Sequence, residues 1–172
     1  MPRYVAFLRG VSPQNARSAD LKHAFEKAGF TNVRTILSSG NVAFNTSLES
    51  ETIIEQQAEA ALQASLERCF YTIVRNSAAL KELLAQDPYA SFTNFPPQAK
   101  RVVSFLRTTC ASNVPLPLVH HDAYVLGQIG REVFTVYEPH PKGPIFMQLI
   151  EKAFGTNVTT RTWETVRKCS IA

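Results

Sequence analysis

The sequence predicts a protein of the α+β class, and three observations lead to this prediction. Short runs rich in β-branched and aromatic residues alternate with segments in which apolar residues recur at helical spacing. Up to residue 86 the order of these segments is β-α-β-β-α-β followed by a short helix, which is the order of a split β-α-β unit. The rest of the chain repeats this order except for its first helix. We therefore expect two ferredoxin-like halves (α/β plaits) in tandem, followed by a C-terminal helix.

Each element of the first half has a local signal. The first strand lies between a proline and a glycine, and Ser18 is a suitable N-cap for a helix that Gly29 ends. The turn Ser39-Gly40-Asn41 joins the second strand to the third. We expect strands at residues 3–9, 32–37, 42–44 and 70–75, and helices at residues 18–28, 52–66 and 77–85.

A turn-rich segment with two adjacent prolines separates the halves. We therefore predict domains at residues 1–86 and 101–172, with residues 87–100 as a linker. In the second half the connection at residues 108–121 takes the place of the first helix, and Thr160 would cap the last one. We expect strands at residues 101–107, 123–126, 132–137 and 157–159, and helices at residues 144–154 and 160–168.

Composition and charge exclude several classes of protein. Of the 172 residues, 45% are hydrophobic and 19% are charged, which excludes a wholly disordered chain. The net charge of +4 is far below that of a histone-like nucleic-acid binder. Three widely spaced cysteines without a CxxC pair argue against disulfides and a thiolate zinc site, and they predict a cytoplasmic protein. No apolar run approaches the roughly 18 residues of a membrane span, so no membrane partner is expected.

Three blocks of sequence together resemble a known family. They are residues 4–11 (YVAFLRGV), residues 29–44 (GFTNVRTILSSGNVAF) and residues 159–166 (TTRTWETV). In this order they resemble the uncharacterised family called domain of unknown function 1697 (DUF1697), over nearly the whole chain. The resemblance implies a soluble protein of bacterial type with two ferredoxin-like halves. It implies no activity, because the family is named for lacking one, and no cofactor is expected.

The chain departs from the family pattern in two places. The first loop of the family usually runs Arg-Gly-Ile-Asn, a small residue and two glycines, whereas here residues 9–11 (RGV) are followed by SPQNA. Without the glycine pair, close approach of the backbone to a phosphate is less favourable. The last block of the family usually has asparagine on both sides of the tryptophan, whereas here Thr162 and Glu164 flank Trp163. A carboxylate at this place disfavours an anion directly beside it.

Two groups of residues are candidates for an anion-binding site. In the first group, Arg9 and Gly10 end the first strand, and Ser39, Gly40 and Asn41 form a turn with exposed backbone N–H groups and an amide. The alternative for this group is an ordinary hairpin turn that needs a positive φ at the glycine or the asparagine.

The second group lies at the expected start of the last helix. Thr160 and Arg161 would combine free backbone N–H groups with a guanidinium, and Trp163 would pack beside the ligand. The alternative is that Thr160 only caps the helix, that Arg161 pairs with an acid and that Trp163 lies in the core. A shared site requires the two groups to meet in space.

Other chemistries have weaker signals. The sheet lacks the exposed aromatic rings of RNA-recognition modules, and we expect Phe44 to be buried. His120 and His121 point to opposite faces of a strand and lack a third ligand, so no metal site is expected. No known catalytic or nucleotide-binding motif occurs, and nothing local would activate Cys110. Catalytic residues therefore stay unassigned.

The sequence favours a binding protein for an anionic partner, with a nucleotide or a nucleic acid as the expected partner. Basic residues gather in the second half: Lys100, Arg101, Arg107, Arg161, Arg167 and Lys168. They form a basic surface if the strand from residue 101 and the last helix are neighbours, and the alternative is an ordinary solvated face. A less favoured alternative is an enzyme acting on a small phosphorylated or anionic metabolite, with Glu164 or His120 as a general base. Another is a protein-interaction module with exposed apolar residues at 89–95 (YASFTNF). A homodimer is expected if one sheet face is uncovered.

Overall fold

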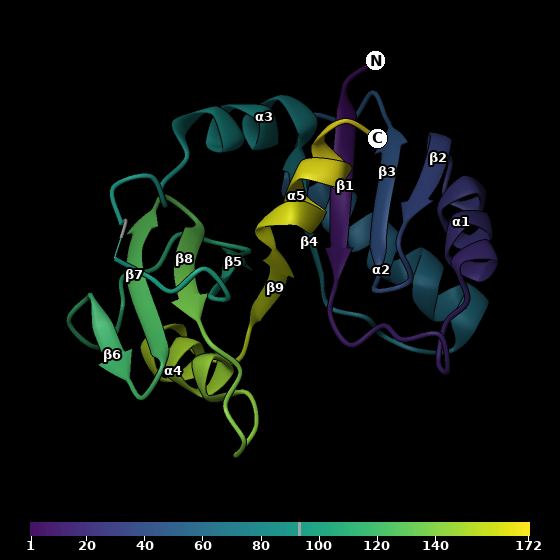
Figure 1. Cartoon of the computed structure of the whole chain (residues 1–172). Coiled ribbons are helices and arrows are strands. Elements are labelled where there is room, and N and C mark those ends of the chain that lie inside the picture. Colours follow the sequence, from purple (N-terminus) through teal and green to yellow (C-terminus); the bar gives the residue numbers. More distant parts are fainter. Residues whose placement is uncertain (93) are drawn as a thin grey trace. The chain divides into compact units, whose positions relative to one another are not determined.

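Figure 1 shows a computed structural model of the chain, which describes residues 1–92 and 94–172. Within these residues the protein has nine strands in two antiparallel sheets, and five helices, so the predicted α+β class is confirmed. The chain divides into two compact units, residues 1–85 with 167–172 and residues 86–166. Thr93 falls within the predicted linker and the aromatic segment, and it lies outside the described residues.

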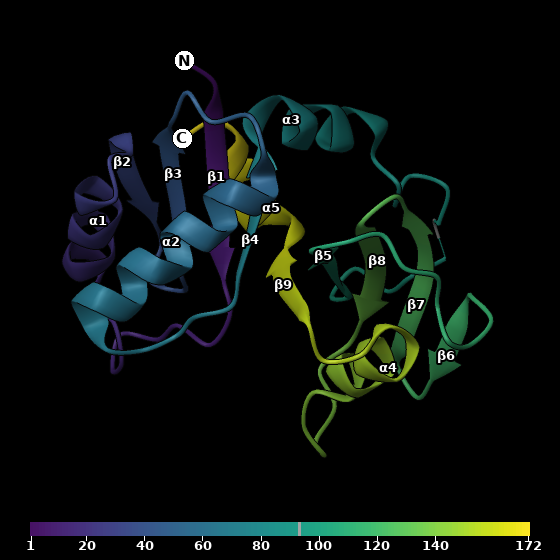
Figure 2. The same cartoon turned by 180° about the vertical axis from the view of Figure 1, so that it is seen from behind.

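The first unit contains the elements of the predicted β-α-β-β-α-β order, with bounds within a few residues of those expected. They are β1 (Arg3–Leu8), α1 (Ser18–Lys27), β2 (Thr31–Ile36), β3 (Asn41–Asn45), α2 (Glu51–Leu66), β4 (Thr72–Asn76) and α3 (Ser77–Gln86). The strand order is β2-β3-β1-β4, and every neighbouring pair is antiparallel, as Figures 1 and 2 show. β1 is therefore a central strand, and β4 is an edge strand.

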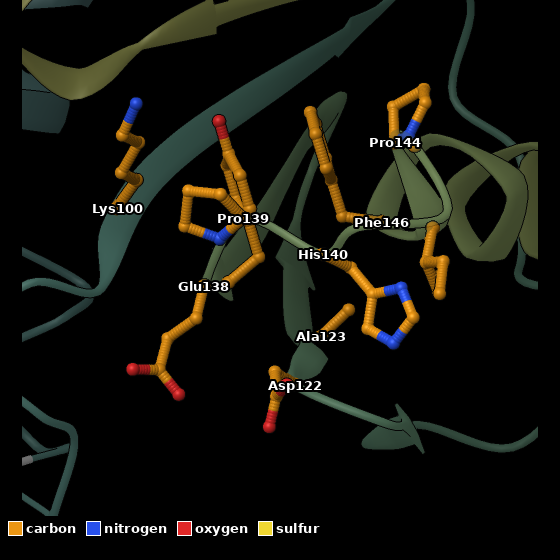
Figure 3. Close-up of a pocket in the computed structure, with 11 residues that line it drawn as sticks. Lys100, Asp122, Ala123, Glu138, Pro139, His140, Pro144 and Phe146 are labelled. Atoms are coloured by element: carbon orange, nitrogen blue, oxygen red, sulfur yellow. The ribbon is translucent and has the colours of Figure 1, made fainter.

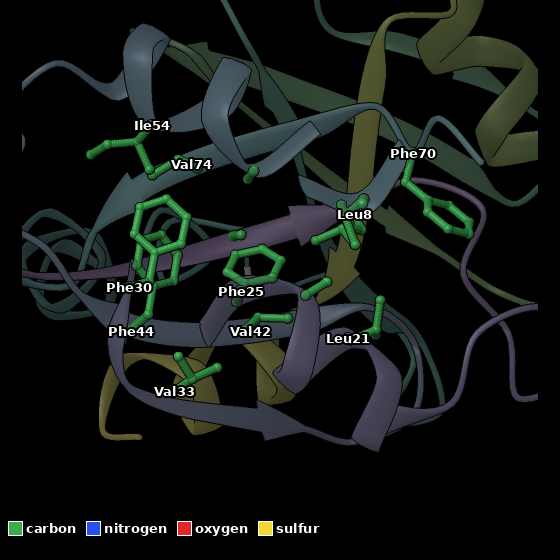
Figure 4. Close-up of a cluster of buried hydrophobic side chains, with 14 of the residues drawn as sticks. Leu8, Leu21, Phe25, Phe30, Val33, Val42, Phe44, Ile54, Phe70 and Val74 are labelled. Atoms are coloured by element: carbon green, nitrogen blue, oxygen red, sulfur yellow. The ribbon is translucent and has the colours of Figure 1, made fainter. Parts of the chain in front are cut away.

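One face of the first sheet packs against α1 and α2 (Figure 4). Phe25 from α1, Ile54 from α2 and Phe44 from β3 are fully buried in this cluster. The ring centroid of Phe44 lies 4.5 Å from that of Phe30 and 5.3 Å from that of Phe25. Burying each phenylalanine contributes about 2–3 kcal/mol to stability. The predicted core position of Phe44 is confirmed.

The opposite face of the same sheet is buried as well. Val5, Phe7, Ala43 and Ile73 alternate with the cluster residues along their strands, and each has 0% of its surface exposed. No aromatic ring on this sheet is therefore open to a nucleobase, which agrees with the weak sequence signal for base stacking. A homodimer through an uncovered face of this sheet is not supported.

Two carboxylates of α2 bind the outer edge of β4. Glu55 accepts a hydrogen bond from the backbone N–H of Val74, and Glu59 accepts one from the backbone N–H of Thr72, each at 3.0 Å. The two glutamates are four residues apart, so they lie on one face of the helix. β4 pairs with β1 on its other side. Glu55 is almost fully buried, with 1% of its surface exposed.

The second unit contains a five-stranded sheet with the order β6-β7-β8-β5-β9. Within residues 86–166 α4 packs on one face of it, against Leu106, Val125 and Val133. The described elements are β5 (Lys100–Leu106), β6 (Leu118–His120), β7 (Ala123–Ile129), β8 (Glu132–Tyr137), α4 (Ile145–Phe154) and β9 (Val158–Thr162), and then α5 (Trp163–Ser170), which ends in the first unit. β6 was not predicted. It has only three residues and pairs with β7 alone, so it carries too short a pattern to identify.

The predicted cap of the last helix is wrong. Thr160 lies in β9, where it pairs with Ser104 of β5, and the two hydroxyl oxygens are 2.7 Å apart. The hydroxyl of Thr162 instead accepts the backbone N–H of Thr165 at 3.2 Å. The helix starts later than expected because residues up to Thr162 pair with β5.

The helices of the described part of the chain show no membrane span: none combines the length and the apolar character that a crossing requires.

Gly40 provides a test of the turn between β2 and β3. Its φ is +82°, and a Cβ there would lie 2.8 Å from the Cβ of Val11. Gly40→Ala should lower the free energy of unfolding by about 2–4 kcal/mol, from backbone strain and overpacking together. Gly10 is a matched control, because its φ is +79° but no atom lies within 4 Å of its added Cβ. Urea unfolding of Gly40→Ala and Gly10→Ala measures the loss in the free energy of unfolding for each variant. Equal losses would contradict the argument that the added Cβ at Gly40 is overpacked.

Glu55 provides a test of the β4 edge. Glu55→Ala should lower the free energy of unfolding by about 2–4 kcal/mol, because it leaves the Val74 N–H without this acceptor and opens a cavity. Glu55→Gln keeps an acceptor oxygen, so it should lower the free energy of unfolding much less than Glu55→Ala does. The exposed neighbour Gln56 is the control, since Gln56→Ala should change stability by less than about 0.5 kcal/mol. A small effect of Glu55→Ala in chemical denaturation would refute a stabilising role.

Candidate functional site

The first group of predicted site residues is brought together in the first unit. β1 ends at Leu8, whose backbone N–H donates to the carbonyl of Gly40 at 2.8 Å. The next residue, Arg9, is half-buried, and its backbone N–H donates to the carbonyl of Tyr71 at 2.9 Å. Gly10 is exposed. The end of β1 and the turn of residues 37–40 are therefore neighbours.

Within this group, Gly40 and Asn41 have clear structural roles. Gly40 has a positive φ and close neighbours, as the alternative interpretation of an ordinary turn expects. The side-chain amide of Asn41 donates to the carbonyl of Ile36 at 3.0 Å and to the hydroxyl of Ser39 at 3.1 Å. Asn41 has only 1% of its surface exposed. Its amide therefore closes the turn, whereas Ser39 is exposed and faces solvent.

The second group lies in the second unit, along β9 and the start of α5. Arg161 is half-buried on β9, and its guanidinium donates to the carbonyl of Thr160 at 2.9 Å. Trp163 has 4% of its surface exposed and packs edge-on against Tyr89, with ring centroids 5.1 Å apart. Because the two groups belong to different units, a shared site remains a prediction.

A pocket that the sequence did not indicate lies within the second unit. We call it the β8–α4 pocket; it is lined by residues 100, 122–123, 137–140 and 143–146 and has a volume of about 220 Å³. Its base is a row across three strands, because Tyr137 of β8 pairs with Lys100 of β5 and with Ala123 of β7. Side chains of cross-strand partners share one sheet face.

Aromatic rings and charged groups surround this row. Phe146 from the first turn of α4 stacks on Tyr137, with ring centroids 3.8 Å apart and planes 11° from parallel. In Figure 3 the amino group of Lys100 extends to one side of the pocket, and the carboxylates of Asp122 and Glu138 extend to the other. Burial raises the pKa of the Tyr137 hydroxyl, so it stays protonated and available as a donor at neutral pH.

The loop at residues 139–144 forms one wall of the β8–α4 pocket. Within it, the backbone N–H of Lys142 donates to Nδ1 of His140 at 3.1 Å. The ring centroid of His140 lies 5.0 Å from that of His121, which in turn lies 4.2 Å from that of His120. No local sequence pattern indicates this group, because the ring partners of His140 come from the end of β6 and the turn before β7.

A metal centre receives no support from the structure. In the described part of the chain, no group of three or more histidine, cysteine, aspartate or glutamate side chains is arranged to hold a metal ion. His140 illustrates the reason, because its Nδ1 already accepts a hydrogen bond, which leaves the proton on Nε2 of the neutral ring. The histidine group is therefore held by one hydrogen bond and by contacts between its rings.

Comparisons with known proteins give a family and a fold. The family described as "Protein of unknown function (DUF1697)" matches residues 1–124, which confirms the resemblance to this family; the match contains the first two sequence blocks and ends before the third. The chain is also similar to a solved structure, the conserved bacterial protein SP0830 from Streptococcus pneumoniae. The identity is 16%, the TM-score is 0.71, and the match covers 99% of this chain and 97% of that chain. At this identity the likeness shows the fold alone. The curated proteins gave no match.

Tyr89 provides a test of the core of the second unit. Its hydroxyl donates to the carbonyl of Val102, and burial, the largest cause, raises its pKa far above the ordinary value. Above about pH 10 the tyrosine hydroxyl ionises in the unfolded state, whereas Tyr89 stays protonated in the folded state. The contribution of the Tyr89 hydroxyl to stability is therefore complete below about pH 10 and is lost as the pH rises above this value.

The comparison uses Tyr89→Phe. At pH 7 the wild type should be more stable by about 1 kcal/mol, from the hydrogen bond to Val102. This advantage should disappear between about pH 10 and pH 11, because only the wild type loses the contribution described above. Urea unfolding followed by the fluorescence of Trp163, the single tryptophan, measures both values. A difference that stays constant across this range would be incompatible with a buried, protonated hydroxyl.

Proposed function

Because the chain belongs to a family of proteins of unknown function, DUF1697, we propose a function from the β8–α4 pocket itself: the protein binds a small anionic ligand that carries a planar ring. The observation that carries this proposal is the stacked pair Tyr137 and Phe146 beside the amino group of Lys100, in one cavity. Aromatic walls with a few polar groups at fixed places are typical of small-molecule sites.

The volume and chemistry of the pocket support this ligand class. A cavity of about 220 Å³ accommodates one ring system, so the ribose and phosphate of a larger ligand would extend from it toward Lys100. A planar ring gains favourable contact against the faces or edges of Tyr137 and Phe146. Lys100 supplies a charge-assisted hydrogen bond to a phosphate or carboxylate, and the hydroxyl of Tyr137 supplies a second donor. A nucleoside monophosphate has both parts, so it is the ligand class that we propose to test first.

We also propose that the two units share the ferredoxin-like plan. The order β2-β3-β1-β4 of the first sheet corresponds to β7-β8-β5-β9 in the second, with β6 added at one edge. α2 connects β3 to β4 as α4 connects β8 to β9, and no helix lies between β5 and β7 in the described residues. This correspondence supports the tandem arrangement expected from the sequence.

A second candidate function is protein interaction through an aromatic surface of the second unit. Phe92 has 41% of its surface exposed and borders a cavity of about 210 Å³ with Phe95, Pro96, Pro97 and Arg101. Tyr89 at the base of this surface is buried, so the exposed part of the predicted apolar segment is smaller than expected. A cytoplasmic location, a homodimer and a nucleic-acid partner remain predictions.

Lys100 provides the test of the proposed function. Isothermal titration calorimetry with adenosine 5′-monophosphate and uridine 5′-monophosphate should detect binding to the wild type. Lys100→Met should weaken it about tenfold, because a charge-assisted hydrogen bond is lost. Lys152 is the matched control, since it is an exposed lysine on α4 outside the pocket, and Lys152→Met should leave the affinity within about twofold. Adenosine, which lacks the phosphate, should bind all variants equally.

Two outcomes would contradict the proposal. Absence of binding for every mononucleotide and for small aromatic acids would exclude the ligand class. Weaker binding in Arg161→Ala with unchanged binding in Lys100→Met would move the site to β9, as the sequence first indicated. Fluorescence anisotropy with short single-stranded RNA at two salt concentrations separately tests the nucleic-acid partner, because phosphate contacts make binding weaken steeply with salt.

A further inference from the structure

The loop at one wall of the β8–α4 pocket contains a hydrogen bond that requires a neutral histidine, beside a backbone bond from the Gly143 N–H to the His140 carbonyl at 3.1 Å. The backbone N–H of Lys142 donates to Nδ1 of His140 at 3.1 Å. The donor lies two residues after the acceptor, as in an Asx turn, where an aspartate or asparagine oxygen takes the place of Nδ1. The loop thus folds back on itself between the end of β8 and the start of α4, and His140, Gly143 and Pro144 of this loop line the pocket.

Protonation removes this acceptor. Because Nδ1 of the neutral ring accepts a hydrogen bond, the ring proton lies on Nε2. When the ring takes up a second proton, Nδ1 becomes a donor and faces the N–H of Lys142, which is also a donor. The hydrogen bond is then lost, and two donors oppose each other. Imidazole is the side chain whose unperturbed form changes charge between about pH 5 and pH 8.

The surroundings of His140 include charges of both signs. His121 in the turn before β7 is in ring contact with His140, and His120 at the end of β6 is in ring contact with His121. Asp122, Glu138 and Lys100 line the same pocket, and Lys142 follows His140 by two residues. Among the contacts of the ring, the hydrogen bond from the Lys142 N–H is the one whose acceptor is lost on protonation.

We propose that His140 is a proton-sensitive latch: the neutral ring adds a side-chain bond that fastens the loop of residues 139–144 at the β8–α4 pocket, and protonation of the ring loosens the loop and weakens ligand binding. The inference rests on the proposed function, since it assigns a regulation to the same pocket. The effect of His140 protonation on the loop does not require a bound ligand, so it can be tested on the protein alone.

His140→Asn is the matched variant. The oxygen of asparagine can accept the N–H of residue 142 in a true Asx turn, but the amide does not titrate in this range. Between about pH 7.5 and pH 5.5, the affinity of the wild type for adenosine 5′-monophosphate should fall about two- to tenfold relative to that of His140→Asn, because one hydrogen bond is at stake. Titration of the ligand phosphate affects both proteins equally and cancels in this ratio.

His121→Asn serves as a second control. His121 has a φ of +50°, a conformation that asparagine tolerates, so the turn is preserved. This variant removes the neighbouring imidazole but keeps the bond between Lys142 and His140, and it should retain most of the pH dependence. Loss of the pH dependence in His121→Asn with its persistence in His140→Asn would overturn the assignment to His140.

A measurement without ligand separates the latch from the proposed function. Hydrogen exchange of the Lys142 amide, followed by NMR, should become faster in the wild type than in His140→Asn as the pH falls, once each rate is divided by its intrinsic value. If this occurs while no mononucleotide binds at any pH, the latch stands and the proposed ligand fails. If exchange protection is the same in both proteins at every pH, or if binding strengthens on acidification, the latch is refuted.

Discussion

The first unit depends on how the outer edge of β4 is satisfied. β4 pairs with β1 on one side, so the N–H groups on its other side need acceptors elsewhere. Glu55 and Glu59, one helical turn apart on α2, accept two of them. The same helix contributes Ile54 and Leu62 to the core over this sheet. One helix, α2, therefore both accepts the hydrogen bonds of the β4 edge and covers the core, so a displacement of α2 would expose the edge and the core together.

The turn after β2 shows why a candidate site and a structural turn have the same sequence signal. A Gly-Asn pair that exposes backbone N–H groups suits an anion, and the same pair suits a hairpin with a positive φ. The sequence could not separate these interpretations, since both need the same residue types. Distances separate them for two residues: the amide of Asn41 is used inside the turn, and Gly40 has no room for a Cβ. Arg9, Gly10 and Ser39 are left as the part of the prediction that ligand binding must test.

The sequence predicted local elements well and distant partnerships poorly. The order of strands and helices followed from periodicity, and Phe44 is buried as expected, although Ala43 on the opposite face of the strand is buried as well. The start of α5 was misplaced, because it depends on how far β9 pairs with β5, some 55 residues earlier in the chain. The β8–α4 pocket was missed for the same reason: Lys100, Tyr137 and Ala123 become neighbours only through strand register. No local pattern encodes such a row.

The second unit forms a pocket at the place where its helical cover stops. In the first unit α1 and α2 together cover one sheet face, whereas the described connection between β5 and β7 contains β6 and loops but no helix. α4 begins at Ile145, so it meets the row of Lys100, Tyr137 and Ala123 chiefly through Phe146 of its first turn. The loop of residues 139–144 borders the remaining side of the pocket. It places the imidazole of His140 at a position where a covering helix would place an apolar side chain. Under the ferredoxin-like plan that we propose, the missing helix would account for the polar, ring-lined cavity on this sheet, and it directs the search for function to the second unit.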